Sequence, residues 1–196
     1  MVSIQKDSNT VVLALGGNIP SHAGNPSRTL TAALGVLVSH GFRLQAVSRY
    51  FRTPSFPAGA GPVYVNACAI VAPPAGMALY PDRVLAALHA VEAEFGRIRK
   101  DRWAARGLDL DLIAMGGAVL PDAHTYAYWK SLPPADQLRR APAGLILPHP
   151  RMAERGFVLI PLADILPAWR HPVTDETVIE MLAALPDAEK AAIRPI

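Results

Sequence analysis

The chain has 196 residues, which suits one domain with a hydrophobic core, and 51% of them are hydrophobic. The net charge of +3 is modest and much of the positive charge lies in residues 97–106, which favours a local anion site over an extended nucleic-acid surface. No uncharged apolar run approaches the roughly 18 residues that span a membrane, and residues 1–10 lack the apolar core of a secretion signal. We therefore expect a cytoplasmic protein, in which the lone Cys68 is a buried thiol.

The first 71 residues predict a strand, a helix and two further strands. Residues 11–15 are typical of a buried strand, and we expect Gly16-Gly17-Asn18 to turn sharply after it with positive φ. Asn25-Pro26 matches the cap and first position of a helix that ends at Gly41. Strands are predicted at residues 42–51 and 64–71, and on the second of these Tyr64 and Asn66 share a face.

A second helix is predicted from Pro81 to Gly96, with Glu92 at the edge of its apolar stripe. In the strand at residues 108–115, leucines alternate with acids, so Asp109 and Asp111 share the face opposite the core. The element order predicts an α+β fold: a ferredoxin-like antiparallel sheet with helices packed on one face, as a single domain over residues 1–196.

The remaining residues predict less regular structure. Gly116-Gly117 could turn a hairpin into residues 118–120, within an extended loop at 116–144. The aromatic residues of this loop, Tyr126, Tyr128 and Trp129, either cap the site or pack onto the nearest surface. Residues 157–161 are interpreted as a short strand and 178–185 as a closing helix.

Asp109 and Asp111 are the first candidate site. Two carboxylates held side by side repel each other, which a divalent cation between or beside them relieves. Five cations and Trp103 occupy residues 97–106 just upstream, and cations beside a hard-metal site are what a magnesium-bound polyphosphate requires. An exposed acidic strand face after a solvated basic loop is the alternative, and local physics leaves both open.

Residues 96–111 resemble the signature of the 6-hydroxymethyl-7,8-dihydropterin pyrophosphokinase family, which carries G-R-x-R and then R-W-G-P-R-x-L-D-L-D. Here these become Gly96-Arg97-Ile98-Arg99 and Arg102-Trp103-Ala104-Ala105-Arg106-Gly107-Leu108-Asp109-Leu110-Asp111. Other family motifs occur in order over about residues 11–170: Leu15-Gly16-Gly17-Asn18, Arg52-Thr53-Pro54, Tyr64-Val65-Asn66, Glu92, Leu147-Pro148-His149-Pro150-Arg151 and Arg155-Gly156-Phe157-Val158-Leu159.

The resemblance implies that ATP gives its β,γ-diphosphate to the hydroxymethyl oxygen of the reduced pterin, with release of AMP, in tetrahydrofolate biosynthesis. It implies ATP as co-substrate and two Mg²⁺ ions. We expect a monomer that uses these small-molecule substrates and has no nucleic-acid or membrane partner.

The resemblance also implies the residues of the site. Those implied for catalysis are Arg97, Arg106, Asp109 and Asp111, of which the two aspartates are also the metal ligands. Those implied for ATP binding are Glu92, Arg99, Arg102, Leu112, His149 and Arg155. Those implied for pterin binding are Thr53, Pro54, Ser55, Phe56, Tyr64, Asn66, Trp103 and Phe157.

Four departures from the family pattern affect the basic loop and the nucleotide contacts. Ala104-Ala105 replaces the usual Gly-Pro and Gly107 the usual Thr, while His89 replaces a Gln and Pro150 an aromatic residue.

Two other classes of protein are alternatives to this family. A ferredoxin-like module that binds single-stranded nucleic acid would use the cations and Trp103, but the Asp pair opposes such binding. An unrelated D-x-D nucleotide-sugar transferase would normally be longer.

Overall fold

The computed structural model describes residues 10–55, 61–76, 80–96, 107–133, 136 and 139–196. Its centre is one six-stranded antiparallel sheet in the order β5-β1-β4-β3-β6, with β2 also paired to β4. The strands are β1 (Val11–Gly17), β2 (Arg43–Val47), β3 (Phe51–Thr53), β4 (Tyr64–Ala72), β5 (Asp109–Met115) and β6 (Arg194–Pro195).

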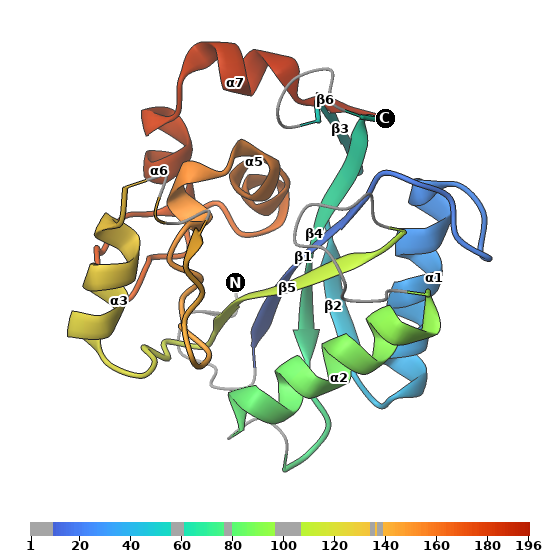
Figure 1. The fold of residues 1–196 in the computed structure, drawn as a ribbon, viewed down its shortest axis with the longest axis horizontal. Coiled ribbons are helices and arrows are strands. Elements are labelled where there is room, and N and C mark those ends of the chain that lie inside the picture. Colours follow the sequence, from blue (N-terminus) through green and yellow to red (C-terminus); the bar gives the residue numbers. More distant parts are fainter. Residues whose placement is uncertain (1–9, 56–60, 77–79, 97–106, 134–135, 137–138) are drawn as a thin grey trace.

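Helices cover both faces of this sheet, as Figure 1 shows. Helices α1 (Pro26–Ser39) and α2 (Pro81–Glu94) pack on one face, over residues such as Leu13 and Leu15 of β1. Helices α5 (Gly156–Ile165) and α6 (Val178–Ala184) pack on the other, over the alternate residues Val12 and Ala14. The predicted antiparallel sheet with packed helices in a single domain is confirmed, but the prediction that helices lie on one face is wrong.

Helix α5 of the second layer was missed because its apolar sequence has no clear period. Residues 157–161, predicted as a strand, lie within α5, and that prediction is wrong. A short apolar run fits a buried strand and a buried helix equally well. The helix buries Val158, Leu159 and Leu162, at helical spacing, against the sheet. The closing helix predicted at 178–185 is confirmed as α6, and a further helix, α7 (Asp187–Ala192), follows it.

Other predicted boundaries are partly right. Asn25 caps α1, where its Oδ1 accepts a hydrogen bond from the Arg28 backbone N–H at 3.0 Å, and Gly41, which has a positive φ of 87°, follows the end of the helix as predicted. The strand predicted at 42–51 is two strands, β2 and β3. Between them Arg49 leaves the sheet, and its Nη2 pairs with Asp164 Oδ1 of α5 at 2.7 Å.

The segment 116–144 differs from the extended loop that was predicted. The expected hairpin partner at 118–120 does not form; Leu120 instead bridges to Leu147, with N···O distances of 2.9 and 3.2 Å. A helix, α3 (Ala123–Ser131), follows the bridge. Asp122 caps it by accepting from the Thr125 backbone N–H at 2.9 Å. In the part of the chain that the structure describes, neither α3 nor any other helix is long and apolar enough to cross a membrane.

Helix α3 is fixed to the body of the protein by a buried aromatic pair. Tyr126 Oη lies 2.8 Å from His171 Nε2, and both side chains are 1% exposed. His171 Nδ1 accepts from the backbone N–H groups of Val173 and Thr174, so the proton of the neutral ring lies on Nε2 and points to Tyr126. Burial, with a smaller contribution from Lys130, lowers the pKa of His171 from 6.5 to about 4, while Glu176 opposes the shift.

We expect this histidine to make the protein less stable in mild acid. Between pH 6.5 and about 4 the unfolded chain binds a proton at His171 that the folded protein does not, so the free energy of unfolding falls as the pH falls. The loss should reach about 3 kcal/mol for this group. Urea denaturation at several pH values will measure it, and His171→Gln should flatten the dependence.

His124, which is exposed on α3 close to Tyr126, provides the control. His124→Gln should keep the wild-type slope of stability against pH. His149, whose pKa is also depressed, will leave some slope in every variant. An unchanged slope in His171→Gln would show that His171 is not the group responsible.

Candidate active site

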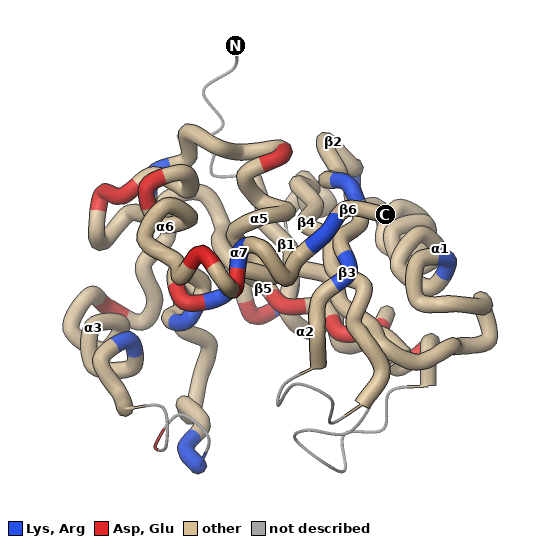
Figure 2. Tube along the Cα trace, turned by 90° about the horizontal axis from the view of Figure 1, so that it is seen from above, with Lys and Arg blue, Asp and Glu red and all other residues tan. Residues whose placement is uncertain are grey.

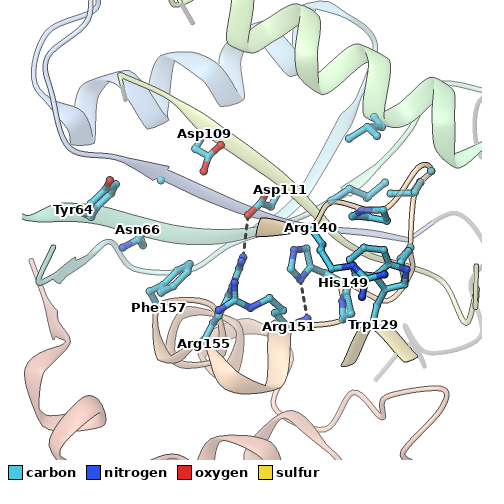
Figure 3. Close-up of a pocket in the computed structure, with 18 of the residues that line it drawn as sticks. Tyr64, Asn66, Asp109, Asp111, Trp129, Arg140, His149, Arg151, Arg155 and Phe157 are labelled. Carbon is cyan, nitrogen blue, oxygen red and sulfur yellow. Dashed lines mark hydrogen bonds and ion pairs between the residues drawn. The ribbon is translucent and has the colours of Figure 1, made fainter. Parts of the chain in front are cut away.

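The register of the sheet brings the predicted polar residues together at one end. Asp109 of β5, Gly16 of β1 and Asn66 of β4 are direct cross-strand partners in one row. Because side chains two residues apart share a face, Asp111 and Tyr64 lie on the same face as this row. It is the face covered by α5, whose first turn carries Phe157 toward these residues (Figure 3).

The position of the Asn66 amide depends on the lack of a side chain at Gly16. Gly16 does not have positive φ and lies inside β1, so the prediction of a sharp turn at Gly16-Gly17-Asn18 is wrong. The glycine is needed for another reason: a Cβ at residue 16 would lie 2.8 Å from Asn66 Oδ1. The Asn66 amide is buried and its Nδ2 donates to Thr53 Oγ1 at 2.8 Å. The absence of a side chain at Gly16 therefore gives the amide its position.

The two aspartates lie in the middle of the site, half-buried on β5. Arg155, which precedes α5, places its Nη1 3.4 Å from Asp111 Oδ2, and its guanidinium also lies 5.5 Å from the Phe157 ring centroid. Glu92 of α2 is 1% exposed, and its Oε1 accepts the Leu110 backbone N–H at 2.7 Å. The residue between the two aspartates is thus tied to α2, which fixes the strand that carries them.

His149 is held in one orientation near the aspartates. Its backbone N–H donates to Ile113 O at 2.7 Å, and its Nδ1 accepts from the Arg151 backbone N–H at 3.1 Å. Burial, followed by the charges of Arg155 and Arg151, lowers the pKa of His149 well below 6.5. The imidazole is therefore neutral near pH 7, and with Nδ1 as acceptor its Nε2–H is the donor.

These residues line one elongated cleft of about 780 Å³, within the range of small-molecule sites. Tyr64, Asn66 and Phe157 lie at one end, Asp109 and Asp111 in the middle, and Trp129 with Arg140 at the other end beside His149 (Figure 3). A ligand that spans the cleft must therefore pass the carboxylate pair.

The structure brings ten of the predicted site residues to this cleft: Thr53, Pro54, Tyr64, Asn66, Asp109, Asp111, Leu112, His149, Arg155 and Phe157. Ser55 is buried next to them in sequence, and Glu92 lies behind β5, not among the described residues of the lining. The remaining predicted residues lie outside the described part of the chain: Phe56, Arg97, Arg99, Arg102, Trp103 and Arg106.

The cleft also includes residues that sequence reasoning did not assign. Asp82 and Leu85 come from α2, and Trp129 and Arg140 from the segment 116–144. The sequence contained a signal for Gly16, Pro150 and Arg151, which stand in the family motifs, and for Trp129, one of the aromatics that could cap the site. The residues of α2 gave no signal because they are part of an ordinary amphipathic helix.

The donor set of the cleft fits magnesium better than a metal with an all-protein cage. Among the described residues no group of three or more His, Cys, Asp or Glu side chains could hold a metal. Mg²⁺ typically takes only one or two carboxylates and completes its shell with water and substrate phosphates. Asp109 and Asp111, adjacent on one face and open to the cleft, match that pattern.

The fold and the cleft define an α+β protein with a small-molecule site at one end of an antiparallel sheet, built around a carboxylate pair. The chain belongs to the 7,8-dihydro-6-hydroxymethylpterin-pyrophosphokinase (HPPK) family, which matches residues 12–167. The resemblance predicted from the motifs is confirmed.

Individual relatives agree with this assignment. The chain is 36% identical over 178 residues to a 2-amino-4-hydroxy-6-hydroxymethyldihydropteridine pyrophosphokinase of Pseudomonas aeruginosa, which covers 90% of this chain and 91% of that protein. It is 33% identical over 171 residues to the pyrophosphokinase of the same name from Synechocystis sp., covering 87% and 73%.

Among solved structures, wild-type Plasmodium falciparum HPPK-DHPS with pteroate shares the fold, with a TM-score of 0.60 at 12% sequence identity. The comparison covers 89% of this chain but only 44% of that one, so this chain spans less than half of that protein. At this identity the likeness concerns the fold alone.

Proposed function

We propose that the protein transfers the β,γ-diphosphate of ATP to the hydroxymethyl group of 6-hydroxymethyl-7,8-dihydropterin, a step of folate biosynthesis. The hydroxymethyl oxygen bonds to the β-phosphorus, the bond from that phosphorus to the α,β-bridging oxygen breaks, AMP leaves with this oxygen, and the hydroxyl proton passes to water. The observation that carries the proposal is the order of groups along the cleft. The Asn66 amide and aromatic rings lie at one end, the carboxylate pair lies in the middle, and the Trp129 indole lies at the other end.

The end with Asn66 suits the flat, amide-like edge of a pterin. An Asn amide offers both a donor and an acceptor, and the Thr53 hydroxyl fixes its plane. Phe157 and Tyr64 border the same space and provide aromatic surface. From the family resemblance we propose that Pro54, Ser55, Phe56 and Trp103 complete this half of the site.

The middle of the cleft suits the transferred diphosphate. We propose that Asp109 and Asp111 hold two Mg²⁺ ions; bound magnesium supplies charge neutralisation of the phosphates. We propose that Arg155 and the Nε2–H of His149, which line the cleft, donate to phosphate oxygens, while Glu92 holds β5 through the Leu110 N–H. Phosphoryl-type transfer asks a protein mainly for alignment and charge stabilisation, so no strong general base is required.

The remaining proposed roles fall to the basic loop and to the nucleotide end. From the resemblance we propose that Arg97 and Arg106 stabilise the transferred group and that Arg99 and Arg102 hold the triphosphate. Leu112, which lines the cleft from β5, would contact the nucleotide. We also propose that the protein works as a monomer in the cytoplasm; the free, buried Cys68 thiol is consistent with a reducing compartment.

A single assay tests the reaction. Incubation with ATP, magnesium and the reduced pterin alcohol should release AMP, detected by ion-exchange chromatography, in equal amount to the pterin diphosphate. Release of ADP, as an ordinary kinase would give, would remove the proposal.

The single-stranded nucleic-acid alternative gains no support from the family assignment. Figure 2 shows the basic positions of the described residues scattered among acidic ones, with the acidic positions of β5 near the centre of the view. Titration with single-stranded DNA is a suitable comparison for the binding of magnesium-ATP.

A further inference from the structure

Helix α3 places an aromatic side chain of the segment 116–144 in the cleft. The segment is fixed at its start by the Leu120–Leu147 bridge and on its buried side by Tyr126 and His171. Trp129 lies three residues after Tyr126, so the two side chains are neighbours on the helix surface. The contacts that hold Tyr126 therefore also hold Trp129, which is half-buried and lines the cleft.

Trp129 is part of a small cluster of flat groups. The Arg140 guanidinium lies 5.7 Å from the Trp129 ring centroid and 5.4 Å from that of Tyr128. The Tyr128 and Trp129 rings meet edge to face, with centroids 5.8 Å apart at 83°. Of the two rings, only Trp129 is among the described residues of the cleft lining. Arg140 and Tyr128 thus restrain the indole while it remains accessible from the cleft.

The cleft lining also includes apolar residues from three separate elements. Leu85 of α2, Leu112 of β5 and Ile146 near the bridge are among them, and the polar Asp82 and Arg151 line the cleft as well. Figure 3 shows Trp129 and Arg140 on the side of Asp111 away from Tyr64 and Asn66. A nucleotide whose phosphates reach the carboxylates would therefore place its base at the end of the cleft that holds Trp129.

We propose that Trp129, restrained by Arg140, is a stacking surface for the adenine base of ATP. The assignment rests on the proposed function, because it takes ATP as the nucleotide. It gives the segment 116–144 a role in substrate binding: this segment extends the nucleotide end of the cleft with a contact that neither β5 nor α2 supplies. The contact recognises the base and not the phosphates.

The experiment compares ligands with and without a base. Isothermal titration calorimetry measures the affinity of wild type, Trp129→Ala and Trp129→Phe for magnesium-ATP, AMP and inorganic tripolyphosphate. Trp129→Ala should weaken ATP and AMP binding by the same factor, on the order of tenfold, the scale of one base–aromatic stack. Tripolyphosphate and the reduced pterin should bind as to wild type, and Trp129→Phe should keep most of the affinity.

His124→Ala is the control, since His124 is exposed on the same helix as Trp129 and lies outside the described lining of the cleft. It should leave AMP affinity within about twofold of wild type, well below one base–aromatic stack. Thermal melts check that each variant is folded.

The outcomes separate the two proposals. If Trp129→Ala binds ATP and AMP normally while wild type releases AMP from ATP, the stacking role falls and the pyrophosphokinase activity stands. An equal loss of tripolyphosphate affinity would also overturn the stacking role, because it would place Trp129 on the phosphates or on the shape of the whole site. Wild-type protein that binds neither ATP nor AMP would overturn both.

Discussion

Asp109→Asn and Asp111→Asn are each expected to lower turnover by roughly 10²-fold or more, the scale of losing one group that stabilises transition-state charge. Each change keeps the size of the side chain and removes one anionic oxygen from the proposed magnesium site. Both residues are half-buried on β5, and the strand is held by its pairing with β1 and by Glu92, so the fold should be intact. Steady-state rates at limiting magnesium will measure the effect.

Asp187→Asn is a suitable control for this pair. Its side chain is fully exposed on α7, away from the described residues of the cleft. It should keep wild-type turnover at every magnesium concentration. Wild-type rates in both β5 variants at limiting magnesium would show that the two aspartates do not bind the metal.

Gly16→Ala should weaken binding of the reduced pterin by roughly 10- to 100-fold, which corresponds to one or two lost hydrogen bonds to a planar ligand. The added Cβ would lie 2.8 Å from Asn66 Oδ1, so the amide must leave the position in which Thr53 holds it. Affinity for magnesium-ATP should change little because the nucleotide end lies beyond the carboxylates. Calorimetry with each ligand separates the two effects.

Gly117→Ala serves as its control, since a Cβ at that position would meet nothing within 4 Å. A double-mutant cycle with Asn66→Ala sharpens the test. If Gly16→Ala acts through the amide, it should cost almost nothing more once the amide is gone. Fully additive losses would mean that Gly16 affects the pterin by another route.

The strands of this sheet were predictable wherever the alternation of apolar and polar residues was clear. That alternation placed Asp109 and Asp111 on one face, and likewise Tyr64 and Asn66. It could not place the two strands relative to each other, because register depends on pairing between distant segments. The row through Asp109, Gly16 and Asn66 became visible only in the folded protein.

Two parts of the site could not be decided from the sequence, for different reasons. The run at 157–161 has no polar residue to reveal its period, so the helix that carries Phe157 was mistaken for a strand. Trp129 depends on a tertiary contact: its helix is placed by Tyr126 and His171, 45 residues apart in sequence. The role of Gly16 was also misread, because conformational freedom and lack of a side chain are separate reasons for a glycine.

The contact between Arg155 and Asp111 has a consequence for the stability of the protein when no metal ion is bound. Without metal, two carboxylates on neighbouring positions of one face would repel each other, but the guanidinium 3.4 Å from Asp111 offsets part of that repulsion inside the protein itself. The carboxylate pair therefore has a counter-charge from the chain itself, and we expect that folding does not require an ion. We expect the same melting temperature in EDTA as in magnesium when no nucleotide is present, whereas a lower one in EDTA would show that the ion is part of the folded structure. Under the proposed function, magnesium would then bind and leave together with each nucleotide and would not be a permanent part of the folded protein.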